Sequence, residues 1–154
     1  MEEVLMAAKE KLKKILIVDD SDIQLVVAEG ILKAKYDVVT AKSGKEALVM
    51  LTKGLVPDLI LLDILMPDMD GWETYNKING ISLLRNVPIA FLTSLSGIVE
   101  RLRASRLGAA DFINKPYDRV ILLEKVEKLL NGERISQDQG SKEAEASAEP
   151  QGTS

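Results

Sequence analysis

Three carboxylates, one hydroxyl and one amine each follow a short apolar run of the sequence: Asp19, Asp20, Asp63, Thr93 and Lys115. An apolar run that stops at a polar residue is typical of a strand buried on both faces, with the polar group at its carboxyl end. In open parallel sheets, ligands bind at that edge. We therefore expect the five side chains to meet there, although a single Asp at a strand end is more commonly the cap of a turn.

Converging carboxylates repel one another, so such a cluster needs a cation. The chain contains neither cysteine nor histidine. Oxygen ligands alone favour a hard ion, which makes Mg²⁺ the first candidate and Mn²⁺ the second. Lys115 would add a positive charge and Thr93 a neutral donor. Together these groups can receive an oxyanion, which makes Asp63 a candidate nucleophile for covalent phosphoryl transfer.

Strand and helix patterns alternate through residues 15–132. The sequence predicts strands at 15–18, 37–41, 58–63, 88–93 and 110–114, each followed by a helix. This alternation is typical of an α/β fold, here a five-stranded parallel sheet in a doubly wound, flavodoxin-like (βα)5 arrangement. Right-handed crossovers would bring all five carboxyl ends to one edge.

Apolar spacing also predicts which side of two helices faces the core. In the helix capped by Asp20 or Ser21, we expect an inward stripe of Ile23, Val26, Val27, Gly30 and Ile31. In the last helix, capped by Asp118, we expect a broad apolar face of Val120, Leu122, Leu123, Val126, Leu129 and Leu130.

The two ends of the chain differ in composition from the middle. Residues 1–14 have an amphipathic pattern, which indicates either a packed helix or a frayed leader. Residues 133–154 are rich in Glu, Ser, Gln, Gly and Ala, so we expect a disordered acidic tail. The net charge of -4 gives no support for direct nucleic-acid binding, and no run approaches the length of a membrane span. We expect a soluble, cytoplasmic protein that does not bind membranes.

The order and spacing of these motifs resemble the receiver domain of two-component response regulators. The resemblance rests on Asp19-Asp20, Asp63, Leu65–Gly71, Thr93 and Lys115-Pro116, and it covers about residues 14–132. It implies that Asp63 accepts a phosphoryl group from a histidine kinase or a histidine phosphotransfer protein. It also implies that Asp20, Asp63 and the backbone carbonyl of Leu65 bind Mg²⁺, with Asp19 acting through water.

The resemblance further implies a conformational switch. Lys115 would bind the phosphoryl group, with a cis peptide bond before Pro116. The Thr93 hydroxyl would move to a phosphoryl oxygen, and Phe112 would turn inward behind it. Leucines lie two positions after Asp63 and two after Thr93, at Leu65 and Leu95, and apolar cover there predicts slow self-dephosphorylation.

The surface that this switch would change consists of the helix after Gly97, the strand at 110–114 and the last helix. It contains four arginines, which we expect to be exposed and to face a downstream protein: Arg101, Arg103, Arg106 and Arg119.

Other functions fit the sequence less well. A haloacid dehalogenase-type enzyme would need an aspartate where Leu65 stands, so we expect no enzyme beyond self-dephosphorylation. A flavodoxin-like FMN carrier would need a phosphate-binding loop after the first strand. The acidic segment Asp19–Asp22 occupies that position and would repel the phosphate. The stronger alternative is an interaction module with the same fold that works without phosphorylation. The sequence leaves the oligomeric state open.

Overall fold

The computed structural model describes residues 2, 12–94 and 97–134. Its elements follow the chain in the order β1 (Lys14–Val18), α2 (Asp22–Leu32), β2 (Asp37–Ala41), α3 (Gly44–Thr52), β3 (Leu59–Asp63), α4 (Gly71–Asn79), the short 3₁₀ helix η1 (Ser82–Leu84), β4 (Ile89–Thr93), α5 (Ile98–Leu107), β5 (Asp111–Asn114) and α6 (Arg119–Leu130). All strand pairs are parallel, and the strand order is β2-β1-β3-β4-β5. The predicted doubly wound α/β fold is confirmed.

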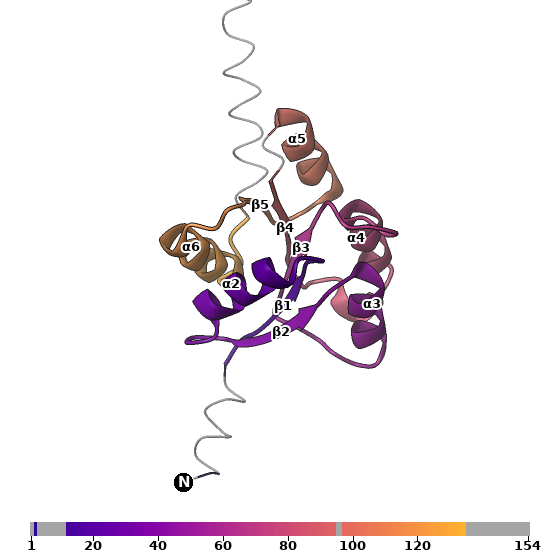
Figure 1. The fold of residues 1–154 in the computed structure, drawn as a ribbon. Coiled ribbons are helices and arrows are strands. Elements are labelled where there is room, and N and C mark those ends of the chain that lie inside the picture. Colours follow the sequence, from indigo (N-terminus) through magenta and orange to yellow (C-terminus); the bar gives the residue numbers. More distant parts are fainter. Residues whose placement is uncertain (1, 3–11, 95–96, 135–154) are drawn as a thin grey trace, which may run out of the picture.

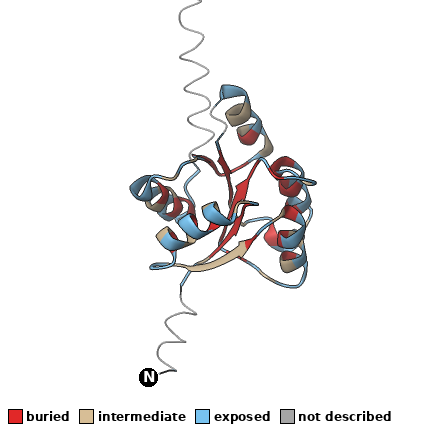
Figure 2. Ribbon diagram, viewed as in Figure 1, coloured by how far each residue is buried: buried red, intermediate tan, exposed pale blue. Residues whose placement is uncertain are grey.

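The sheet separates two hydrophobic cores (Figures 1 and 2). Successive strand residues point to opposite faces, so Leu16 packs with α3, α4 and α5, whereas Ile15 and Ile17 pack with α2 and α6. β1, β3 and β4 lie inside the sheet and have apolar residues on both faces. This arrangement explains why their sequences are continuous apolar runs rather than alternating ones.

Four helices start at side-chain caps that the structure shows directly. Ser21, Ser43, Asp70 and Asp118 each accept a hydrogen bond from a backbone N–H in the first turn that follows. α5 instead ends at Gly108, whose φ of 90° is a left-handed conformation that glycine adopts without steric cost. Local capping therefore fixes where these elements begin and end.

The predicted inward stripe of α2 is wrong except at Ile31, which is half-buried against the core. Ile23 is 74% exposed and Val26 is 69% exposed, while Leu25, Ala28 and Leu32 are buried. Both sides of this helix are apolar, so the spacing of its apolar residues does not single out one face. The helix packs on the neighbouring sheet through the stripe that includes Leu25.

The last helix differs from its prediction at one end. Leu122, Val126 and Leu129 are buried as expected, but Val120 is 61% exposed. Val120 lies in the first turn of α6, where it is not covered by the sheet.

The predicted domain limits and the two ends remain predictions. β1 begins at Lys14 and α6 ends at Leu130. Most of the leader at 1–14 and of the tail at 133–154 lies outside the described residues. Within the described part of the chain, no helix is long and apolar enough to cross a bilayer.

Candidate functional site

The structure brings Asp19, Asp20 and Asp63 together at the carboxyl edge of the sheet. One carboxylate oxygen from each lies within 4.8 Å of the others, and we call these three residues the carboxylate cluster. The register explains the convergence, because β1 and β3 are neighbours and Val18 pairs with Leu62. The next residue on each strand is then an aspartate. Asp19 and Asp63 are buried, whereas Asp20 is exposed.

Lys115 reaches this cluster from the end of β5. Its Nζ atom lies 2.5 Å from Oδ2 of Asp19 and 3.3 Å from Oδ1 of Asp63. Its backbone N–H donates to the carbonyl of Thr93 at 2.8 Å, which ties this loop to β4. The peptide bond between Lys115 and Pro116 is cis.

The site favours positive charge. Burial, and after it the nearby Asp19 carboxylate, raise the pKa of Asp63 to about 6, although Lys115 opposes both effects. One amine therefore leaves three carboxylates under-compensated. All three donors are carboxylate oxygens, and at least one is open to solvent, which fits a hard divalent ion such as Mg²⁺.

Thr93 lies on β4, the strand next to the Asp63 strand, and Phe112 lies one strand further out, on β5. Thr93 is the last residue of β4, directly after the Leu92 that pairs with Asp63. It is fully buried. Phe112 is 4% exposed and pairs across the strands with Phe91, so its ring is packed in the core rather than in solvent. The structure thus places a hydroxyl one residue beyond the Asp63 position, with an aromatic ring on the next strand.

The loop after β3 passes very close to Asp63. The N–H of Gly71 donates to the carbonyl of Ile64 at 2.7 Å. A Cβ atom on Gly71 would lie only 2.2 Å from the backbone oxygen of Asp63, so a side chain cannot fit there. Leu65 is 56% exposed at the start of this loop. The other residue in the dephosphorylation prediction, Leu95, lies outside the described residues.

Two neighbouring residues were not singled out as site residues from the sequence. The backbone N–H of Ser21 donates to Oδ1 of Asp19 at 3.0 Å, which fixes that carboxylate. Tyr117 has a buried hydroxyl that has no hydrogen-bond partner among the described residues. Burial and the charges of Asp19 and Asp63 raise the pKa of Tyr117, so the phenol keeps its proton. Its only sequence signal was its place after Lys115-Pro116.

The four arginines of the expected partner surface are not equivalent. Arg101 is half-buried, with its guanidinium carbon 5.8 Å from the centre of the Phe112 ring, so the expectation that it is exposed is wrong. The corresponding atom of Arg103 lies 4.3 Å from the centre of the Trp72 ring. Arg106 and Arg119 are exposed. Aromatic rings inside the domain therefore engage two of the four cations.

Comparison with known sequences gives one consistent result. A family model described as the response regulator receiver domain matches residues 15–127. Response regulator PleD of Caulobacter vibrioides is 39% identical over 117 residues, which are 75% of this chain and 26% of PleD. The transcriptional regulatory protein YrkP of Bacillus subtilis is 37% identical over 131 residues, which are 84% of this chain and 54% of YrkP. The chain thus spans about a quarter of one relative and half of the other.

Solved structures of similar fold cover a similar share of this chain. Chemotaxis protein CheY4 of Vibrio cholerae matches 76% of this chain and 98% of its own, with a TM-score of 0.72 and 30% identity. The signal receiver domain of a signal transduction histidine kinase from Syntrophus aciditrophicus matches 78% of this chain and 91% of its own, with a TM-score of 0.70 and 39% identity.

Proposed function

The chain belongs to the response regulator receiver domain family of two-component signal transduction, and from this premise we propose that Asp63 is its phosphoacceptor. The observation that supports the proposal is the contact of Lys115 with both Asp19 and Asp63, at 2.5 and 3.3 Å. The carboxylates can hold a cation, and that cation together with the Lys115 ammonium can stabilise an oxyanion attached at Asp63.

The reaction is a transfer between two covalent partners. A carboxylate oxygen of Asp63 attacks the phosphorus of a phosphohistidine on a histidine kinase or histidine phosphotransfer protein. The P–N bond breaks as the P–O bond forms, and the imidazole that leaves takes up a proton from solvent. Bound Mg²⁺ would neutralise charge on the transferring phosphoryl oxygens.

Each residue of the site has a defined part in this proposal. Asp20, Asp63 and the backbone carbonyl of Leu65 would hold the ion, with Asp19 acting through water. The Lys115 ammonium, already beside Asp63, would pair with a phosphoryl oxygen. Its present contact with Asp19 would then weaken, because the new dianion attracts the ammonium more strongly.

The switch that follows would act through Thr93 and Phe112. A phosphoryl group on Asp63 offers the Thr93 hydroxyl an acceptor that the unmodified carboxylate does not, so the two states differ in contacts and their populations shift. Phe112 has no hydroxyl, so its part rests on packing. Its contact with Arg101 links this change to α5, and the surface of α5, β5 and α6 would face a downstream protein.

The lifetime of the phosphorylated form depends on how water reaches the phosphoryl group. We propose that Leu65 and Leu95 hinder an attacking water and make self-dephosphorylation slow. Leu65 is well exposed at the site, so Leu65→Asn can be made with little effect on the core. We expect faster loss of phosphoryl in this variant and in Leu95→Glu; an unchanged decay rate in both would contradict the idea.

Intact mass spectrometry tests the phosphoacceptor directly. The full chain and its Asp63→Asn variant are incubated with acetyl phosphate, with and without Mg²⁺. We expect one phosphoryl adduct that requires Mg²⁺ and is absent from the variant. If the folded wild-type chain binds Mg²⁺ but acquires no adduct, an interaction module that works without phosphorylation becomes the better assignment. An adduct that survives in the variant would place the acceptor elsewhere.

A further inference from the structure

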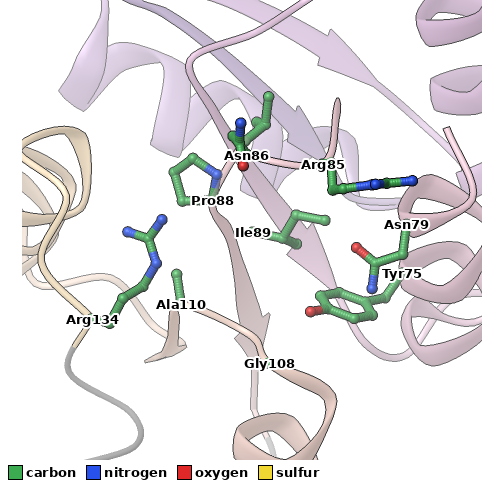
Figure 3. A pocket seen from close by; sticks show the side chains of 10 residues that line it. Tyr75, Asn79, Arg85, Asn86, Pro88, Ile89, Gly108, Ala110 and Arg134 are labelled. Atoms are coloured by element: carbon green, nitrogen blue, oxygen red, sulfur yellow. The ribbon is translucent and has the colours of Figure 1, made fainter. Parts of the chain in front are cut away.

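A hollow lies at the opposite edge of the sheet from the carboxylate cluster. It has a volume of about 360 Å³ and opens at the amino ends of β4 and β5. Its floor is formed by Pro88, Ile89, Ala110 and Gly108 (Figure 3), and because Ile89 and Ala110 are buried, the surface that faces the hollow is mainly polar. We call it the amino-edge pocket. Its volume falls in the range of sites that bind small organic molecules.

Two guanidinium groups line this pocket from opposite sides. Arg85 follows η1 and Arg134 follows α6, and Figure 3 shows their side chains on either side of the floor. Neither makes an ion pair with a carboxylate in the part of the chain that the structure describes, and Arg134 donates only to the backbone carbonyl of Glu133. Among the described lining residues, none is acidic. The pocket therefore concentrates positive charge in a chain whose net charge is negative.

Neutral polar groups complete the lining. The amides of Asn79 and Asn86 can each donate to an anion or accept from a hydroxyl. The Tyr75 hydroxyl donates its proton to the carbonyl of Leu107 at 2.9 Å, so its oxygen remains available as an acceptor. A Cβ atom on Gly108 would lie 3.5 Å from that hydroxyl. Glycine at this position therefore leaves the space beside Tyr75 open.

We propose that the amino-edge pocket binds a small organic anion that bears a carboxylate or a phosphate. An anionic group can accept paired hydrogen bonds from a guanidinium, and further polar groups of the ligand can bond the amides of Asn79 and Asn86. The simpler account is that both arginines merely offset the negative ends of helices that terminate here. That account predicts no specific anion binding in the pocket. It also does not explain why arginines from two separate segments line the same pocket.

Titration calorimetry on the full chain tests this proposal. Phenyl phosphate and succinate serve as probes, in buffer without Mg²⁺ so that the carboxylate cluster repels anions. Arg85→Gln and Arg134→Gln remove one guanidinium each, and Arg119→Gln removes an exposed arginine outside the pocket. Circular dichroism checks that each variant is folded, which is expected because all three side chains are exposed.

We expect one saturable site for at least one probe, weakened about tenfold or more in each pocket variant and unchanged in Arg119→Gln. The probe that binds identifies phosphate or carboxylate as the preferred group. A specific pocket should bind its probe with a dissociation constant below about 10 mM. If neither probe saturates the protein up to that concentration, the proposal is overturned. Equal weakening in all three variants would also overturn it, because that result indicates general charge attraction.

Discussion

The guanidinium carbon of Arg103 lies 4.3 Å from the centre of the Trp72 ring, which joins α5 to the start of α4. Trp72 is the only tryptophan in the chain and is 8% exposed, and its ring also contacts Phe91 at 4.6 Å between centres. α5 buries a single residue, Ala104. This cation–π contact therefore acts together with the Arg101–Phe112 contact and the Tyr75 hydrogen bond to Leu107 in holding the helix.

We therefore expect Arg103→Ala to reduce the unfolding free energy by about 0.5–1 kcal/mol and to change the emission spectrum of Trp72. Arg106→Ala removes an exposed cation from the same helix and should change neither quantity. Urea denaturation followed by fluorescence measures both. If the two variants behave alike, the ring contact adds nothing beyond surface charge.

Asp63 predicts a specific pH dependence of stability in metal-free buffer. Burial and Asp19 raise its pKa to about 6, above the value near 4 of an unfolded chain. The folded state thus binds this proton more tightly. The associated stability is fully present below pH 4 and is lost as the pH rises through about 6. Asp63→Asn, which cannot ionise, should be more stable than wild type at pH 7.5 and lose this advantage by pH 4.

Added Mg²⁺ gives the matching control for this prediction. The ion should stabilise the wild-type chain at pH 7.5 by binding only the folded state, and less so below pH 6 as protons compete for Asp63. In Asp63→Asn the effect should be much smaller. Thermal melting across this pH range, with and without Mg²⁺, measures it; an equal Mg²⁺ effect in both proteins would argue against Asp63 as a ligand.

Two tyrosine hydroxyls should respond in opposite ways to the same substitution. The hydroxyl of Tyr117 is buried and has no partner among the described residues, whereas that of Tyr75 donates to the carbonyl of Leu107. Removing an unpaired buried polar group relieves a desolvation cost, so Tyr117→Phe should raise the unfolding free energy by about 1 kcal/mol. Tyr75→Phe should lower it by a similar amount. Loss of stability in Tyr117→Phe would show that its hydroxyl is bonded in solution.

The two faces of α2 can be separated by alanine substitutions. Leu25 is 5% exposed and faces the sheet, so Leu25→Ala should cost about 2–5 kcal/mol by leaving a cavity. Ile23, at 74% exposure, should tolerate Ile23→Ala within about 0.5 kcal/mol. Equilibrium denaturation gives both values. A large cost at Ile23 together with a small one at Leu25 would restore the face first expected from the sequence.

This helix also shows where sequence patterns reach their limit. Strand ends were predictable, because an apolar run that stops at an aspartate has one direction, and the register of Val18 with Leu62 then places Asp19 beside Asp63. A helix with apolar residues on both sides has no such direction, so only the position of the sheet selects the stripe that includes Leu25.

Long-range side-chain contacts set a second limit. Arg101 and Arg103 have the charge of surface residues, and no spacing rule indicates that each lies over an aromatic ring from another element. That the Tyr117 hydroxyl has no partner among the described residues is equally impossible to read from the sequence, since it depends on which groups surround the hydroxyl after folding. The positions of residues at strand ends were predictable, because strand pairing sets them. The side-chain contacts made between helices and the core were not.

Gly71 offers the sharpest test of how the loop after β3 supports the site. A Cβ atom there would lie 2.2 Å from the backbone oxygen of Asp63 and 2.7 Å from Cα of Ile64, which are backbone atoms that cannot rotate away. We expect Gly71→Ala to cost several kcal/mol, in the range of severe core overpacking, and to weaken Mg²⁺ binding because Asp63 must shift.

Gly30 is the matched control: it lies within α2 with nothing within 4 Å of its added Cβ. Gly30→Ala should stabilise the protein by about 0.5–1 kcal/mol. Denaturation and Mg²⁺ titration of both variants decide the matter, and a Gly71→Ala protein that binds Mg²⁺ with wild-type affinity would show that the loop does not position Asp63.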